Sequence, residues 1–483
     1  MDSIYLIAKE AHSYELSTLI REFFPLIRVD LERSEKQWGI ELSEDEKTAV
    51  LRDENGSSLS SYTLTDPFDH YLGDAGKNYA KVAVYKALEK VKGTLTPWGI
   101  LTGVRPTKVA YQYLTEGCSP KETIRILQEA YLLREDKARL TTFVAKKEAA
   151  ILEDHEGSDI SLYGGILFCP TRCSYCSFIS NDYRAYQKYA DDYVDALAYE
   201  ITSCKELLSG RHIRSLYLGG GTPTTLNVSQ LRKVLEAFQE AVPFSSLDEI
   251  TVEAGRPDTI TKKKLLLLKE MGVGRISINP QTMNQETLDR IGRKHSVESV
   301  KEAMAMAREV GFSSVNMDLI VGLPGEELPE VRNTLTEIEK LHPDNLTVHT
   351  LAVKRSSRMN ELNEGKDLLG ESLCEYRKID AILTLCSESA SRMGMQPYYM
   401  YRQKNMIGNF ENVGYSIPGK EGRYNIEIME ERQSILAFGA GGVSKIYDPK
   451  INRLERVPNV KGVKEYIERI DEMIQRKKGG MIK

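Results

Sequence analysis

The chain has 483 residues, of which 41% are hydrophobic and 28% charged, and its formal net charge is −5. We expect two or three domains at this length, and the composition is typical of a globular protein with an ample core. The acidic balance argues against a nucleic-acid partner. The sequence contains no apolar stretch of about 18 residues, so it predicts no membrane span. The N-terminus carries early charges without the apolar block of a signal peptide, so we expect the cytoplasm.

Residues 1–155 are predicted to form an N-terminal α+β domain, to which the sequence assigns no role. Short apolar runs at 4–8 and 48–51 are typical of strands, and the apolar spacing becomes helical from residue 78. Helices then continue to about residue 154. The passage 96–106 places glycines, prolines and an arginine around Trp98. A ligand loop and a packed connection between helices both fit this passage, and we favour the packed connection.

Residues 156–385 alternate strands, glycine turns and helices, which predicts a parallel sheet. The expected strands lie at 161–168, 215–218, 249–253, 275–278, 314–319 and 345–350. Six such units predict an incomplete (β/α)6 barrel, and we expect its active residues at the carboxyl ends of the strands. Residues 386–483 are predicted to form a mostly helical C-terminal domain that covers the substrate.

The cysteines Cys169, Cys173 and Cys176 follow the first of these strands at the spacing C-x3-C-x2-C. An iron–sulfur cubane normally takes one thiolate on each of its four irons, so three thiolates leave one iron open for a chelating small molecule. A structural zinc site is the alternative, but it normally needs four ligands, and no second cysteine pair lies nearby. The other cysteines are isolated and are interpreted as ordinary thiols: Cys118, Cys204, Cys374 and Cys386.

Further polar or glycine-rich positions follow the later strands. A glycine segment lets backbone approach a ligand closely, and a carboxylate at a strand end can accept hydrogen bonds from both hydroxyls of a ribose. An arginine can bind a carboxylate with two parallel hydrogen bonds. A buried aspartate in such a context predicts a functional position. These candidates are Gly220, Gly221, Thr222, Glu253, Gln281, Arg293 and Asp318.

The cysteine spacing resembles the signature of the radical S-adenosylmethionine enzymes, and Tyr175 fits the aromatic position before their third cysteine. Over about residues 160–350 the chain resembles oxygen-independent coproporphyrinogen III oxidase, also called coproporphyrinogen dehydrogenase. The extra N-terminal residues resemble variant oxidases of anaerobic Gram-positive bacteria. The residues that carry this resemblance are Tyr163 to Cys169, Gly219 to Pro223, Gln281, Arg293, 316–320 and 322–324.

The resemblance implies a 4Fe–4S cluster on the three cysteines and S-adenosylmethionine on its open iron. The glycine segment would then hold the methionine amino group, Arg293 the methionine carboxylate and Glu253 the ribose, while residues 319–320 would face the adenine. It also implies that a 5′-deoxyadenosyl radical removes a hydrogen from each of two propionates, giving protoporphyrinogen IX in haem biosynthesis. Tyr163 is the candidate catalytic side chain beside the adenosyl group or the porphyrinogen.

The resemblance also implies partners. The substrate is a tetracarboxylate porphyrinogen, for which Arg355, Arg358 and Arg402 are the candidate cations, and the electron donor is a low-potential protein such as flavodoxin or ferredoxin. Two departures keep other functions open, because Gly165 replaces a histidine and Phe178 a fourth cysteine of the well-known oxidases. A haem chaperone with a similar barrel is the main alternative. Another radical enzyme, acting on a tetrapyrrole or a tRNA, is the second.

Overall fold

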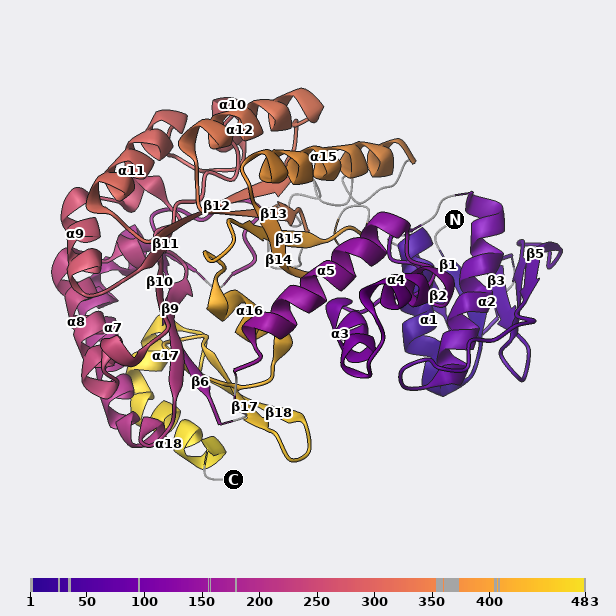
Figure 1. The fold of residues 1–483 in the computed structure, drawn as a ribbon, viewed down its shortest axis with the longest axis horizontal. Coiled ribbons are helices and arrows are strands. Elements are labelled where there is room, and N and C mark those ends of the chain that lie inside the picture. The colour runs from indigo at the N-terminus through magenta and orange to yellow at the C-terminus, as the bar shows by residue number, and fades with distance from the viewer. Residues whose placement is uncertain are drawn as a thin grey trace.

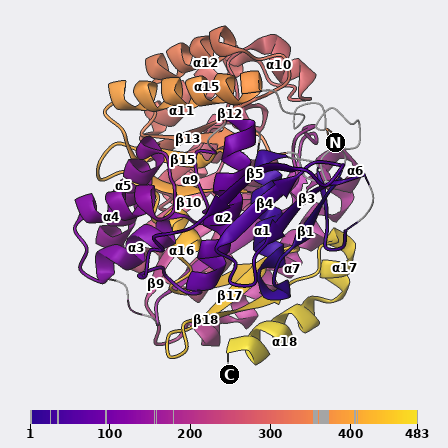
Figure 2. The ribbon, with the colours of Figure 1, turned by 90° about the vertical axis from the view of Figure 1, so that its right-hand side faces the viewer.

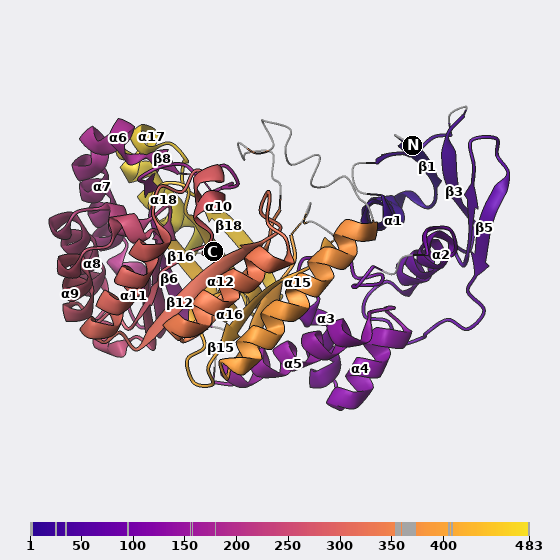
Figure 3. The ribbon, with the colours of Figure 1, turned by 90° about the horizontal axis from the view of Figure 1, so that it is seen from above.

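The computed structural model describes residues 3–481 except 25–26, 34–35, 94–95, 155, 157, 179, 353–358, 360–372, 404–405 and 407–408. The chain forms a curved sheet wrapped by helices, and the N-terminal region lies across its open side (Figures 1 and 2). Seen from above, this region stands beside the barrel rather than within its ring of helices (Figure 3). Within the described residues, no helix is long and apolar enough to span a lipid bilayer.

The N-terminal region is an α+β unit, as predicted. Its five-stranded sheet has the order β2-β1-β3-β4-β5, with β1 parallel to both neighbours and β3, β4 and β5 antiparallel. Helices α2 to α5 follow β5 and lead to the barrel. The elements are β1 (Ser3–Ile7), α1 (Glu10–Phe23), β2 (Arg28–Asp30), β3 (Trp38–Leu42), β4 (Thr48–Arg52), β5 (Ser58–Thr63), α2 (Ala75–Lys92), α3 (Thr107–Thr115), α4 (Pro120–Glu129) and α5 (Glu135–Ile151).

The passage 96–106 is a packed connection, as favoured from the sequence. Trp98 is fully buried, and its indole N–H donates to Glu411 in the C-terminal part of the chain at 3.2 Å. A buried indole normally needs such a partner for its N–H. The connection therefore joins the N-terminal region to the C-terminal segment.

The six predicted β/α units are present and form the core of an eleven-stranded sheet. Buried on both faces, these strands are rich in apolar residues, which is typical of parallel sheets covered by helices. In Figure 1 the helices α7 to α12 form an arc outside the strands. The elements are β6 (Ile160–Ile166), α7 (Ala190–Ser203), β9 (Ile213–Gly220), α8 (Val228–Ala241), β10 (Glu249–Glu253), α9 (Lys262–Glu270), β11 (Arg275–Ser277), α10 (Gln285–Arg290), α11 (Val297–Val310), β12 (Ser314–Val321), α12 (Leu328–Leu341) and β13 (Asn345–Thr350).

The C-terminal residues contribute helices and also strands that the sequence analysis did not anticipate. Both edges of the barrel sheet are extended: β15 pairs with β13 and β14 with β15, while β16 runs parallel to β6 and leads into β17 and β18. These pairings join segments far apart in sequence, so local patterns could not reveal them. The elements are α15 (Leu373–Arg392), β14 (Gln396–Tyr401), β15 (Asn412–Ser416), α16 (Arg423–Glu430), β16 (Ser434–Phe438), β17 (Val443–Asp448), β18 (Arg453–Pro458), α17 (Val463–Glu468) and α18 (Ile470–Met481). The predicted domain boundaries at 155 and 385 stay a prediction.

Candidate active site

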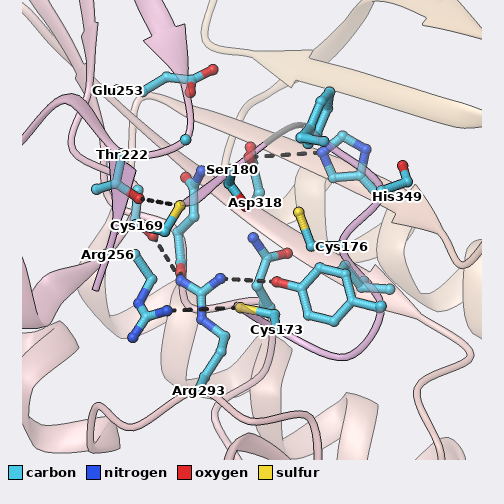
Figure 4. Close-up of a pocket in the computed structure, with 18 of the residues that line it drawn as sticks. Cys169, Cys173, Cys176, Ser180, Thr222, Glu253, Arg256, Arg293, Asp318 and His349 are labelled. Carbon is cyan, nitrogen blue, oxygen red and sulfur yellow. Dashed lines mark hydrogen bonds and ion pairs between the residues drawn. The ribbon is translucent and has the colours of Figure 1, made fainter. Parts of the chain in front are cut away.

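A cavity of about 230 Å³ lies at the carboxyl ends of the barrel strands. The loop that carries Cys169, Cys173 and Cys176, here called the cysteine loop, closes one side. Residues within or just after the carboxyl-terminal parts of β9, β10, β11, β12 and β13 line much of the rest (Figure 4). The structure brings together all the metal and cofactor candidates from the sequence, since each of them lines this cavity: Cys169, Cys173, Cys176, Gly220, Gly221, Thr222, Glu253, Gln281, Arg293 and Asp318.

The three cysteines share this cavity as free thiols. Cys169 ends the short strand β7 (Phe168–Cys169), which pairs with β8 (Asn181–Asp182), and Cys173 and Cys176 follow in the loop between them. Burial raises the pKa of the Cys169 thiol and raises that of Cys176 to about 11. No group of three described His, Cys, Asp or Glu side chains converges on the position of a single metal ion. In a cubane, however, each thiolate binds a different iron.

The glycine segment, residues 219–223 at the end of β9, is held against the cysteine loop by backbone hydrogen bonds. The N–H groups of Gly221 and Thr222 donate to the carbonyls of Ile166 and Phe168 at 2.7 and 2.8 Å. A Cβ on Gly221 would lie 2.7 Å from the Phe168 carbonyl oxygen and 3.1 Å from the Cys169 sulfur, which is too close. Glycine is therefore required here because the segment and the cysteine loop approach each other so closely.

Glu253 lies at the end of β10, and its surroundings shift the pKa of its carboxyl group. The Tyr217 hydroxyl donates to its Oε1 at 2.5 Å. Burial raises the pKa of Glu253 to about 7, and the nearby Asp318 charge adds to this, while the hydrogen bonds from Tyr217 and the Gly220 N–H oppose it. This carboxyl group can therefore lose its proton near neutral pH and accept hydrogen bonds from a ligand.

Gln281 has an unusual backbone conformation, with φ at 68°. For a non-glycine residue this left-handed region is unfavourable by about 1–2 kcal/mol. Two hydrogen bonds to β12 maintain it, one from the Gln281 N–H to the Asp318 carbonyl and one from the Ile320 N–H to the Gln281 carbonyl. The result is a buried side chain at the cavity whose Oε1 has no partner among the described residues, and the same holds for Oδ1 of Asn279. Such atoms fit a site that a polar ligand completes.

Arg293 is 4% exposed and reaches the cavity from the loop after α10. Its Nη1 donates to the Tyr175 hydroxyl at 2.9 Å, and its Nη2 donates to the carbonyls of Gly255 and Asn279 at 2.7 Å each. Only its Nε lacks a hydrogen-bond partner among the described residues. The guanidinium is thus fixed in place, and its two terminal nitrogens are already partnered rather than both directed at a ligand carboxylate.

Asp318 lies in β12 and its side chain approaches His349 of β13, with 3.7 Å between the carboxylate Oδ2 and the imidazole Nε2. Asn316 donates to its other oxygen at 2.7 Å. Both side chains line the cavity, and Ile320 lines it as well. Of the two residues expected to face the adenine, Ile320 is positioned at the cavity, whereas Leu319 is not among the lining residues, and the contact with adenine stays a prediction.

Tyr163, the candidate catalytic residue, does not line this cavity. Its ring stacks with those of Tyr217 and Tyr424 in the barrel interior, with centroids 6.3 Å apart in each case. Burial raises the pKa of its phenol. Alternation along β6 places this side chain toward the barrel interior below the cysteine loop. Its hydroxyl lies close to Gly220, which does line the cavity, and the catalytic role of Tyr163 stays a prediction.

Of the three substrate cations expected from the sequence, the structure describes only Arg402, which does not line the cavity. Arg355 and Arg358 lie outside the described residues. Arg402 is 6% exposed and forms an ion pair with Glu22 of the N-terminal region at 2.8 Å, so it is not available to a substrate carboxylate. Sequence reasoning could not see this, because the partner lies far away in the chain.

Several cavity residues were missed by the sequence analysis. Arg256 and Asn279 follow strands that were recognised, and His349 lies near the end of another, so these positions at strand ends could have identified them. Tyr401 and Asn412 line the cavity from β14 and β15, for which no comparable signal exists.

Comparison with known proteins agrees with this site. Residues 165–338 match the model of the radical SAM superfamily. The oxygen-independent coproporphyrinogen-III oxidase-like protein HemZ of Bacillus subtilis is 39% identical over 82% of this chain and 79% of its own length. The haem chaperone HemW of the same species is 31% identical over 65% of this chain and 76% of its own length. The structure of the coproporphyrinogen III oxidase HemN from Escherichia coli, described as a radical SAM enzyme, covers 68% of this chain and 73% of its own, with 26% identity and a TM-score of 0.53.

The chain therefore belongs to the radical SAM superfamily, in the family of oxygen-independent coproporphyrinogen III oxidase-like proteins. Its cofactors are a 4Fe–4S cluster and S-adenosylmethionine. The residues present fit both, because three thiols share one cavity with a close-packed glycine segment and with buried polar atoms that lack partners within the described chain.

Proposed function

We propose that this protein catalyses the oxygen-independent oxidative decarboxylation of coproporphyrinogen III to protoporphyrinogen IX, a step of haem biosynthesis. One observation carries the proposal: the cysteine loop and the polar strand ends form a single cavity. The likeness to a coproporphyrinogen-III oxidase-like protein, which extends beyond the barrel into the N-terminal region, supports this substrate over others.

We assign the following binding roles to the residues of the cavity. Cys169, Cys173 and Cys176 would hold the cluster, and the glycine segment would hold the methionine amino group. Glu253 would accept hydrogen bonds from the ribose, while Gln281 and Arg293 would fix the methionine end. Together the two cofactors supply an organic radical that removes hydrogen atoms from unactivated carbons, and the buried walls exclude water from it.

The proposed reaction balances for each propionate. One hydrogen atom leaves the β-carbon, and 5′-deoxyadenosine carries it away. The substrate radical then loses CO2 and one electron, which leaves a vinyl group. The electron passes to a one-electron acceptor, and a low-potential donor such as flavodoxin or ferredoxin supplies the electron that starts each turnover.

A haem chaperone is the second candidate. Two observations favour it: the likeness to HemW, and Phe178 at the position of the fourth cysteine of the well-known oxidases. Phe178 is 69% exposed, so this part of the loop presents an apolar ring to solvent. A chaperone would bind haem stoichiometrically and leave the propionates intact.

The deciding experiment is anaerobic incubation of the cluster-loaded protein with coproporphyrinogen III, S-adenosylmethionine, a low-potential reductant and an electron acceptor. We expect 5′-deoxyadenosine to form in a substrate-dependent manner, with release of CO2 and conversion of propionates to vinyl groups by mass analysis. Cys176→Ala is the negative control, because it removes a cluster ligand. Tight haem binding without CO2 release, across several donors and acceptors, would favour the chaperone.

A further inference from the structure

Arg256 is a buried cation beside the cysteine loop, and none of the roles described above uses it. It follows β10 by three residues, and its side chain is 4% exposed. Nε and Nη2 donate to the two carboxylate oxygens of Asp258, both at 2.9 Å. This two-fold contact fixes the plane of the guanidinium and leaves Nη1 as its outer nitrogen.

The Nη1 of Arg256 is directed at the cysteine loop. It donates to the Thr171 hydroxyl at 3.1 Å and to the sulfur of Cys173 at 3.7 Å, as Figure 4 shows for the sulfur. Cys173 is itself buried, with 7% exposure. An N–H···S contact between a permanent cation and a cluster ligand is therefore built into the fold, and water does not screen it.

Hydrogen bonds to cluster sulfurs and nearby charge are two of the means by which proteins set the potential of an iron–sulfur cluster. Reduction adds negative charge to the cluster and its thiolates. A donor and a positive charge at Cys173 stabilise the reduced form more than the oxidised form, so they raise the potential. A carboxylate paired with that cation does the opposite, because it neutralises part of the field.

We propose that Arg256 and Asp258 together set the reduction potential of the cluster. Arg256 raises it through the N–H···S hydrogen bond to Cys173, and Asp258 limits the increase. Both act through Cys173 and are positioning residues rather than catalytic ones. A higher potential makes the cluster easier for a weak electron donor to reduce, at the expense of driving force for cleaving S-adenosylmethionine. This inference goes beyond the proposed function, because it is independent of the substrate.

The test is a redox titration of the reconstituted full-length protein under anaerobic conditions, with the reduced cluster followed by electron paramagnetic resonance. Arg256→Gln should shift the midpoint potential to more negative values, and Asp258→Asn should shift it to more positive values. Arg232→Gln is the matched control, since Arg232 forms a similar two-oxygen contact with Glu270 on the exposed faces of α8 and α9. It should leave the potential unchanged.

The opposite signs separate tuning from mere support of the loop, because both substitutions break the same Arg256–Asp258 contact. Shifts of the same sign, or no shift in cluster-loaded variants, would overturn the proposal. If Arg256→Gln fails to retain the cluster, Asp258→Asn decides alone: a positive shift supports the proposal, and any other result overturns it. Loss of the cluster in both would also overturn it, since the pair would then serve to fold the loop. An inactive protein with these shifts intact would contradict only the oxidase function.

Discussion

Arg402 and Glu22 form a buried ion pair across 380 residues of sequence, with 2.8 Å between Nη2 and Oε1 and 6% exposure on each side chain. This pair anchors the C-terminal segment to the N-terminal region. Glu411 forms a second such anchor, because it accepts hydrogen bonds from Trp98 at 3.2 Å and from Lys137 at 2.6 Å. Each anchor is adjacent in sequence to a cavity-lining residue, Gln403 or Asn412. The N-terminal region therefore holds both ends of one cavity wall.

Replacing Glu22 with alanine should destabilise the protein strongly, because the Arg402 charge would stay buried without its ionic partner. Breaking such a pair typically lowers the free energy of unfolding by about 3–5 kcal/mol. The measurement is the shift of the urea unfolding midpoint. Glu270→Ala, which breaks an exposed pair with Arg232, should shift it very little. Equal shifts in the two variants would show that the Glu22 pair contributes no more than a surface contact.

The three cavity cysteines should be needed for the cluster, and the buried cysteines elsewhere should not. Alanine at Cys169, Cys173 or Cys176 should abolish the brown absorbance of the reconstituted cluster and the cleavage of S-adenosylmethionine. Alanine at Cys204 or Cys386 should preserve both, since these thiols are buried in the core away from the cavity. Iron and sulfide analysis of each purified variant provides the measurement. Loss of the cluster in Cys204→Ala would refute this ligand assignment.

Arg293→Lys should weaken the binding of S-adenosylmethionine while the cluster persists. Lysine keeps the charge, but it cannot reproduce the planar guanidinium that Tyr175 and two carbonyls hold in place. Losing one charge-assisted hydrogen bond from the guanidinium to the methionine end of the ligand costs about 1.5–3 kcal/mol. This corresponds to roughly 10- to 150-fold in affinity. Equilibrium dialysis measures the change. Arg308→Lys, on the exposed side of α11, is the control, and the same affinity in both variants would place the methionine end elsewhere.

The affinity for S-adenosylmethionine should depend on pH through Glu253, whose pKa burial raises to about 7. The ribose hydroxyls donate to an ionised carboxylate, so binding competes with the proton that this side chain holds below pH 7. Affinity should rise from pH 6 to about 7.5 and then level off, and the slope below the pKa should approach about tenfold per pH unit. Dissociation constants measured across this range provide the check. In Glu253→Gln the affinity should be weaker and this dependence lost; an unchanged profile would exclude Glu253 as its source.

Much of the site could be predicted from the sequence because its signals are local. Three thiols within eight consecutive residues must lie close together whatever the fold, and the alternation of strands and helices is visible within short windows. Parallel strands also share their carboxyl edge, so the end of each strand marked a cavity position such as Glu253 or Asp318. These features predicted the fold class, and the family resemblance carried by the same residues implied both cofactors.

Only the tertiary structure decided the relationships between distant segments. The pairing of β16 with β6, the contact of Arg402 with Glu22 and the hydrogen bond from Arg256 to Cys173 each join residues that no local pattern connects. The direction of a single side chain is equally non-local, which is why Tyr163 packs in the barrel and Arg402 faces the N-terminal region. Composition and spacing specify which groups the chain carries, whereas long-range packing determines which of them meet.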